Sequence, residues 1–172
     1  MSIVNAAQWC TDKSVIHYIA TGVDVNETDM TGRTALMAAS LRIRIKRVKI
    51  LIDNGANIHQ KDEDGDTALY YSASHNRYDT TQLLLSKGAY VNTVNKYGGT
   101  PLGVAFMQHF NDIVKILVTT LVIEIGLAMA PLDLPAYVVL WAIEHVAPAV
   151  KTHEKMAIEI LQRIRDRYWL KI

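Results

Sequence analysis

The sequence has almost no cysteine and no segment that reads as a secretory signal. Its 172 residues include one cysteine, Cys10, so no disulfide can form within the chain. This cysteine usage is typical of a reducing compartment, and we expect an intracellular protein of the cytoplasm or nucleus. The first ten residues, MSIVNAAQWC, contain no charged segment followed by an apolar run, so we expect no signal peptide.

An uninterrupted apolar run of membrane-spanning length is also missing. The most apolar region, residues 113–143, is broken by charged residues and prolines: Lys115, Glu124, Pro131, Asp133 and Pro135. A membrane helix needs about 20 consecutive, mostly apolar residues. The sequence therefore favours buried helices here over a transmembrane segment.

Motifs for catalysis and metal binding are absent as well. His153-Glu154 is followed by Lys155, Met156 and Ala157, so the second histidine of a His-Glu-x-x-His site is missing. No phosphate loop, nucleophile elbow or Cys/His metal spacing occurs. The acidic run 62–64 has no further ligands at metal-binding spacing, and the formal net charge of +1 does not favour a polyanionic partner. We expect a non-catalytic protein without cofactor or metal, and we do not expect it to bind nucleic acid.

What the sequence does contain is a repeat with a period of 33 residues. Three segments begin with glycine and share threonine and leucine in register: GRTALMAAS from Gly32, GDTALYYSAS from Gly65 and GGTPLGVAF from Gly98. Three further segments keep the same spacing, GVDVN from Gly22, GANIH from Gly55 and GAYVN from Gly88. A fixed period of this length indicates an array of small, stacked structural units.

These segments resemble the ankyrin repeat family, whose unit reads roughly D-x-x-G-x-T-P-L-H-x-A-A, then a helix, then G-A-D-V-N. The resemblance covers about residues 1–120 and implies an all-α solenoid, in which each unit is a β-turn followed by two antiparallel helices. We expect an N-terminal capping unit at 1–28, repeats at 29–61, 62–94 and 95–127, and a C-terminal helical cap or tail at 128–172. The last repeat is degenerate, because Leu121 stands where its closing glycine should fall.

Residue chemistry supports this assignment and also reveals departures from it. The threonines Thr34, Thr67 and Thr100 can cap the first helix of each unit, and Pro101 suits the first helical position. The histidine of the family motif is replaced by Met37, Tyr70 and Gly103. We expect the hydrogen bonds of that histidine to be missing or replaced.

The stretch LRIRIKRVKILI, residues 41–52, permits more than one interpretation. Its alternation resembles a strand, but a strand would interrupt a helix pair that both neighbouring units preserve. Ile43 occupies the position where the family usually has a turn glycine, so we predict a distorted or widened turn at 42–46. The basic residues Arg42, Arg44, Lys46, Arg47 and Lys49 are interpreted as a solvated rim, with a contact site for an acidic partner or nucleic acid as alternatives.

The family resemblance implies protein binding through a concave surface of turn tips and first-helix side chains. Mapped onto this sequence, the positions that would contact a partner are Met30, Thr31, Arg33, Leu41, Arg42, Glu63, Asp64, Asp66, Ser74, His75, Lys96, Tyr97, Gly99, Met107 and Gln108. The sequence does not define the partner protein or the oligomeric state.

After Leu121 the repeat pattern ends, and two further helices are predicted, from Pro135 to about Val146 and from about Thr152 to Trp169. One interpretation is that they cap the solenoid. The other starts from Leu134, Pro135, Val138, Val139 and Ile143, which resemble the opening of an F-box, although Tyr137 replaces the usual acid. Such tails follow ankyrin repeats in proteins of large DNA viruses, where they recruit a cullin–RING ubiquitin ligase in the host cytoplasm. This resemblance implies a substrate adaptor with ubiquitin-ligase components as partners.

Overall fold

The computed structural model describes residues 2–129, and in this range the chain is helical, with one isolated antiparallel bridge between Thr28 and Thr34. This confirms the predicted all-α fold. The eight helices of the described range are α1 (Ile3–Trp9), α2 (Asp12–Ala20), α3 (Ala35–Ser40), α4 (Ile45–Asp53), α5 (Ala68–Ser74), α6 (Tyr78–Ser86), α7 (Pro101–Met107) and α8 (Asn111–Met129). The helices predicted within 135–169, and the F-box-like residues Leu134 to Ile143, lie outside the described residues.

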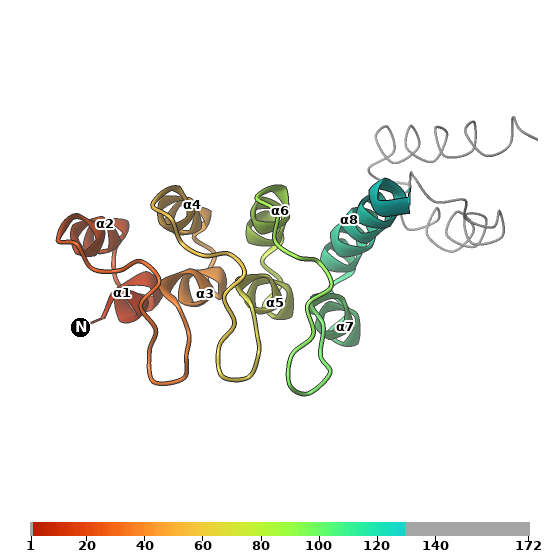
Figure 1. The fold of residues 1–172 in the computed structure, drawn as a ribbon, viewed down its shortest axis with the longest axis horizontal. Helices are drawn as coiled ribbons and strands as arrows, with labels where there is room; N and C mark the ends of the chain where they lie inside the picture. The colour runs from red at the N-terminus through yellow and green to blue at the C-terminus, as the bar shows by residue number, and fades with distance from the viewer. Residues whose placement is uncertain (1, 130–172) are drawn as a thin grey trace, which may run out of the picture. The chain divides into compact units, whose positions relative to one another are not determined.

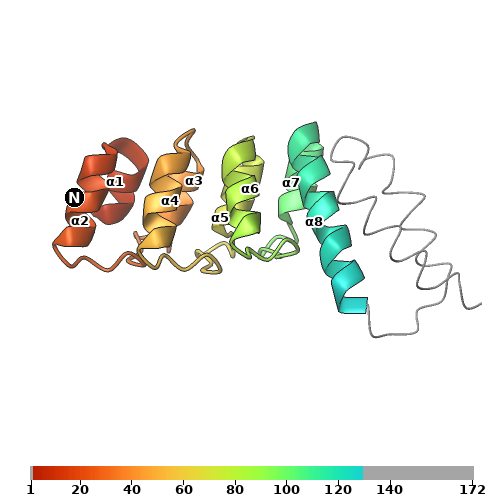
Figure 2. The same ribbon diagram turned by 90° about the horizontal axis from the view of Figure 1, so that it is seen from above.

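Helices α1 to α7 form two layers within the compact unit of residues 1–113; a second unit comprises residues 114–172. The first helices of the pairs, α1, α3, α5 and α7, lie side by side, and α2, α4 and α6 form the layer above them (Figures 1 and 2). The loops before α3, α5 and α7 project away from both layers as three fingers (Figure 1). We call residues 28–34, 61–67 and 94–100 the first, second and third finger.

The first helices of the three repeats, α3, α5 and α7, each begin where a threonine side chain caps them, as predicted. The hydroxyl of Thr34 accepts a hydrogen bond from the backbone N–H of Met37 at 3.3 Å, and that of Thr67 accepts one from Tyr70 at 3.3 Å. In α7, Thr100 has the same role and Pro101 is the first helical residue. These caps satisfy backbone donors that would otherwise lack a partner in the first turn.

Each finger is closed by the aspartate or asparagine at its second position, and backbone hydrogen bonds join adjacent fingers. In the second finger, a carboxylate oxygen of Asp62 accepts from the backbone N–H groups of Asp64 and Asp66, and Gly65 has a φ of +83°. The Glu63 N–H donates to the Thr31 carbonyl at 3.1 Å, and the Lys96 N–H donates to the Asp64 carbonyl at 2.8 Å. Adjacent fingers therefore support one another as a single rigid row.

The core lies between the two helix layers. Short side chains line the buried faces of the first helices, for example Ala38 and Ala73, and allow adjacent helices to approach closely. Val48, Leu51 and Leu84 of the second helices are also buried. The first helices also bury Leu36 and Leu69, so the core combines small and large aliphatic side chains in close packing.

The turn between α3 and α4 is wider than its counterparts. It spans residues 41–44, whereas residues 75–77 and 108–110 suffice in the next two units. In those units Asn76 and His109 adopt left-handed backbone conformations, with φ of 55° and 60°; Ile43 does not. This confirms that the turn is widened, but it lies at 41–44 and not at the predicted 42–46, because α4 already begins at Ile45. The lack of a left-handed residue at Ile43 agrees with the rule that β-branched residues avoid positive φ. The turn and α4 account for residues 41–47, so the strand interpretation is wrong.

Helix α8 continues to Met129, although helices α4 and α6 end at Asp53 and Ser86, which correspond to Thr119 in the 33-residue register. Leu121 stands where the first two repeats have glycine, so no residue favours a left-handed stop there. Among the described residues, no helix is both long enough and apolar enough to cross a membrane.

Candidate protein-binding surface

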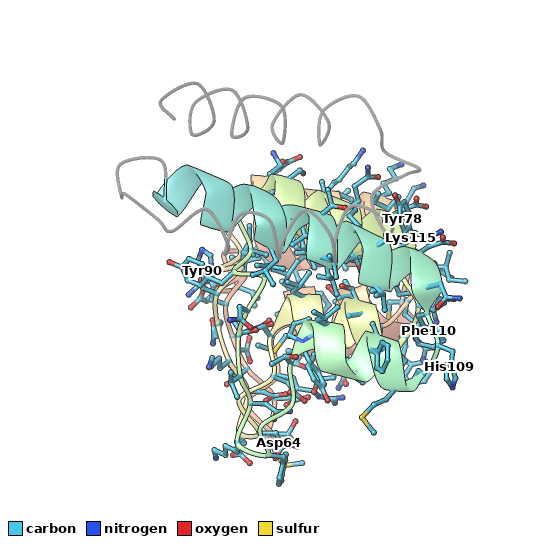
Figure 3. The ribbon with its side chains drawn as sticks, turned by 90° about the vertical axis from the view of Figure 1, so that its right-hand side faces the viewer. Asp64, Tyr78, Tyr90, His109, Phe110 and Lys115 are labelled. Atoms are coloured by element: carbon cyan, nitrogen blue, oxygen red, sulfur yellow. The ribbon has the colours of Figure 1, made fainter. Side chains whose placement is uncertain are left out.

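The predicted contact residues lie on two kinds of element, the fingers and the ends of the first helices. Three large apolar side chains among them are highly exposed: Met30 (97% exposed), Tyr97 (79%) and Met107 (79%). Of the remaining predicted contact residues, some are exposed: Thr31, Glu63, Asp64, His75, Lys96 and Gln108. The others are half-buried: Arg33, Leu41, Arg42, Asp66, Ser74 and Gly99. Figure 3 shows Asp64 at the tip of the fingers and His109 at the far end of α7.

In the first finger, Asp29 organises the surface through both carboxylate oxygens. One oxygen accepts hydrogen bonds from the backbone N–H groups of Thr31 and Arg33, and the other accepts from the Arg33 guanidinium at 2.9 and 3.1 Å. Burial acts to raise the pKa of Asp29, but the hydrogen bonds from Thr31 and Arg33 outweigh it and leave the pKa below its usual 3.8. Arg33 is therefore held within the finger by its own ion pair.

The second and third fingers are tied together through side chains. The Tyr97 hydroxyl donates to an Asp64 carboxylate oxygen at 2.9 Å, and the Asn95 amide donates to Asp66 at 2.8 Å. The bond to Asp64 raises the pKa of Tyr97. Burial raises the pKa of Asp66, and the amide of Asn95 offsets only part of this effect. The exposed acidic tip is thus joined to an exposed aromatic ring in a fixed arrangement.

Tyr71 anchors the second finger to α5. Its hydroxyl donates to the second carboxylate oxygen of Asp62 at 2.6 Å. Burial and this hydrogen bond to a carboxylate both raise the pKa of Tyr71, so the hydroxyl stays protonated as a donor. The structure thus gives Tyr71 a hydrogen-bonding role. At the position of the family histidine in the first repeat, the Met37 sulfur accepts from the Thr34 N–H at 3.4 Å.

The basic stretch 42–49 does not form one solvated rim, and for Arg47 that interpretation is wrong. Arg47 is fully buried, and its guanidinium donates to the carbonyls of Ala7 at 2.7 Å and Cys10 at 2.6 Å and to Asp12 at 3.0 Å. The 33-residue period could have predicted the burial of Arg47, because the equivalent positions 33 and 66 residues later are also buried. They are Thr80 and Ile113. Arg44, Lys46 and Lys49 remain exposed.

Sequence reasoning missed Trp9, at the end of α1. Its ring is 66% exposed, and the Arg42 guanidinium carbon lies 4.2 Å from the ring centroid. Trp9 stands 33 residues before Arg42, at the equivalent position of the N-terminal helix pair. Applying the 33-residue period to the N-terminal helix pair would have identified Trp9 as a candidate contact residue.

Residues 2–129 contain no group of three or more His, Cys, Asp or Glu side chains arranged to hold a metal ion. A shallow depression beside α2 is lined by Cys10, Lys13, Ser14, His17, Tyr18 and Thr21. It is open to solvent and does not enclose a ligand site.

Stacked pairs of short helices with projecting, interlinked fingers define a helical repeat protein. A family model described as ankyrin repeats (3 copies) matches residues 3–95 and, in a second overlapping match, residues 47–127. The matches cover more than half of the chain, and the chain belongs to the ankyrin repeat family. Ankyrin repeats generally mediate protein–protein interaction. A comparison with curated proteins gave no significant match.

Proposed function

We propose that this chain is a non-catalytic binding module that holds a partner protein on its finger tips and first-helix ends. The observation that carries the proposal is the exposure of Met30, Tyr97 and Met107 on these elements. Methionine and aromatic residues are enriched in protein interfaces, where they fill pockets of the partner. A cytoplasmic or nuclear location belongs to the same proposal.

The frame beneath these side chains reduces the cost of binding. Backbone hydrogen bonds join adjacent fingers, and Tyr97 is oriented by Asp64 before any partner arrives. Fewer backbone and side-chain conformations are then lost when the partner docks. A preformed surface of this kind suits binding with little rearrangement.

The test begins with affinity capture from eukaryotic cell lysate and identification of the retained proteins by mass spectrometry. Binding of a purified retained protein is then compared between the wild type and the double variant Met30→Ser/Tyr97→Ser. Loss of two central apolar anchors should weaken binding by about tenfold or more. The control is Gln82→Ala, at an exposed position of α6 away from the fingers. Equal affinities for the wild type and the double variant would contradict the proposed surface.

A second candidate function, a substrate adaptor for a cullin–RING ubiquitin ligase, is supported by the F-box-like sequence at Leu134-Pro135. The capture experiment is repeated with the full chain carrying Leu134→Asp and Pro135→Ala. An adaptor should lose ligase components and keep its other partners. Absence of ligase components from the wild-type capture would remove this candidate and leave the binding module intact.

A further inference from the structure

A cationic and aromatic cluster lies at the N-terminal end of the array, where α1 meets the widened turn after α3. We define it as Trp9, Arg42, Ile43, Arg44 and Lys46. Ile43 is 82% exposed at the turn, although it is a large aliphatic residue, and Arg44 and Lys46 are exposed beside it. Neither residues 1–11 nor residues 30–52 contain an aspartate or glutamate. The next acid along the chain, Asp12, is paired with Arg47. The cluster therefore combines exposed apolar side chains with cationic ones.

The stacking of Arg42 on Trp9 fixes the direction of its donors. A guanidinium 4.2 Å from a ring centroid is within the range of cation–π attraction. Stacking occupies the face of the guanidinium and leaves N–H groups at its edge, where a carboxylate can accept two parallel hydrogen bonds. The pair thus provides one oriented anion contact beside an apolar ring.

Two other arginines hold the backbone of the cluster in place. Arg47 donates to the Ala7 and Cys10 carbonyls and so joins the start of α4 to the end of α1, next to Trp9. From the following repeat, the Arg77 Nε donates to the Leu41 carbonyl at 2.8 Å. The widened turn is therefore fixed on both sides, and Ile43 and Arg44 project from a rigid support.

We propose that this cluster docks an acidic segment of the partner protein. Its carboxylates pair with Arg42, Arg44 and Lys46, and one of its apolar side chains packs against Trp9 and Ile43. The inference rests on the proposed protein-binding function and adds the class of segment that is bound. A long polyanion or an anionic membrane fits less well, because the next finger presents the exposed acids Glu63 and Asp64. A short acidic segment does not need to reach them.

The probe is a phage-displayed library of random short peptides, selected on the full-length chain. Selected peptides should be rich in Asp and Glu and carry an aromatic or aliphatic residue. The cluster variant is Trp9→Gln/Ile43→Asn/Arg44→Gln; its first two changes introduce the residue types of Gln108 and Asn76, the equivalent positions in other repeats. Synthetic copies of the peptides should bind this variant about tenfold or more weakly, since charge-assisted hydrogen bonds are lost. Wild-type affinity should fall as salt is raised.

The single variant Arg44→Glu changes only an exposed side chain, so it should fold normally and still bind the acidic peptides more weakly than the wild type. The melting temperature of each variant is measured and should be unchanged. Neutral peptides that bind the cluster variant as well as the wild type, but not Met30→Ser/Tyr97→Ser, would overturn the inference and leave the proposed function standing. Failure to select any acidic peptide would overturn it as well. Binding to phosphatidylserine vesicles or duplex DNA in that case would instead identify a membrane or a nucleic acid as the occupant.

Discussion

At the scale of single residues, buried and half-buried polar groups decide how the repeats are joined. Arg47 is the largest fully buried side chain of the described residues, and each of its three acceptors belongs to the N-terminal helix pair or the turn within it. A buried guanidinium is tolerated only when its donors are satisfied. Here those donors also satisfy two carbonyls at the end of α1.

Replacement of Arg47 by methionine tests this role, because methionine keeps much of the volume and removes every donor. The Ala7 and Cys10 carbonyls would lose a partner, and Asp12 would lose its ion pair. We expect the free energy of unfolding to fall by about 2–4 kcal/mol, measured by urea denaturation. Arg44→Gln, at an exposed site, should change it by less than about 0.5 kcal/mol. Equal effects of the two substitutions would show that the Arg47 hydrogen bonds and ion pair do not stabilise the fold.

Asp29 gives the fold a dependence on acid pH. Folding lowers the pKa of Asp29 below 3.8, so its charged form is favoured in the folded state. The resulting stabilisation is present above the unfolded pKa and is lost as the pH falls through the folded pKa. Asn95 stands at the equivalent position of the third finger, so Asp29→Asn should keep the turn and remove the charge.

The free energy of unfolding should therefore be higher for the wild type than for Asp29→Asn at about pH 6, and the gap should narrow towards about pH 2. Chemical denaturation at several pH values measures this difference. Asp53→Asn, at an exposed site on α4, serves as the control. A gap that stays constant over this range would show that the ion pair with Arg33 does not account for the effect.

At the scale of elements, the fingers and helix starts were predictable from sequence, whereas contacts between repeats were not. A threonine before an Ala-Leu or Pro-Leu pair, repeated every 33 residues, defines a cap through local chemistry alone. The widened turn followed in the same way from β-branched Ile43. The stacking of Arg42 on Trp9 and the inward direction of Arg47 depend on how adjacent units meet, which local patterns do not specify. The same holds for the bond between Tyr97 and Asp64.

Two finger and loop glycines form a matched pair for testing the close approach of adjacent fingers. Gly65 and Gly88 have nearly equal φ values of +83° and +85°. A Cβ added at Gly65 would lie 3.3 Å from Asn95 Cα, whereas a Cβ added at Gly88 would have no neighbouring atom within 4 Å. Gly88→Val should cost about 1–2 kcal/mol from backbone strain. Gly65→Val should cost about 1–3 kcal/mol more, because the adjacent finger must move. Equal losses in thermal or urea denaturation would show that the fingers do not constrain each other.

At the scale of the whole molecule, stacking of the repeats places equivalent residues of successive units on one surface. Because each unit contacts only its neighbours, the proposed contact residues, which are tens of positions apart in the sequence, recur from one unit to the next along the array. The 33-residue period made this arrangement predictable, and it placed Met30, Tyr97 and Met107 on exposed elements. The charge of the surface was less predictable, since ion pairs and burial remove Arg33 and Arg47 from the set of freely exposed cations.

The most direct test of the account is hydroxyl-radical footprinting of the full chain, alone and bound to a captured partner. Methionine and aromatic side chains react readily when exposed, so the surface carries its own probes. We predict that the partner protects Met30, Tyr97, Met107 and Trp9 from oxidation. Tyr90 is also exposed, but it lies on the side of the fingers away from His109 (Figure 3), and it should react equally in both states. Protection of Tyr90, with Met30 and Tyr97 still oxidised in the complex, would contradict the proposed surface.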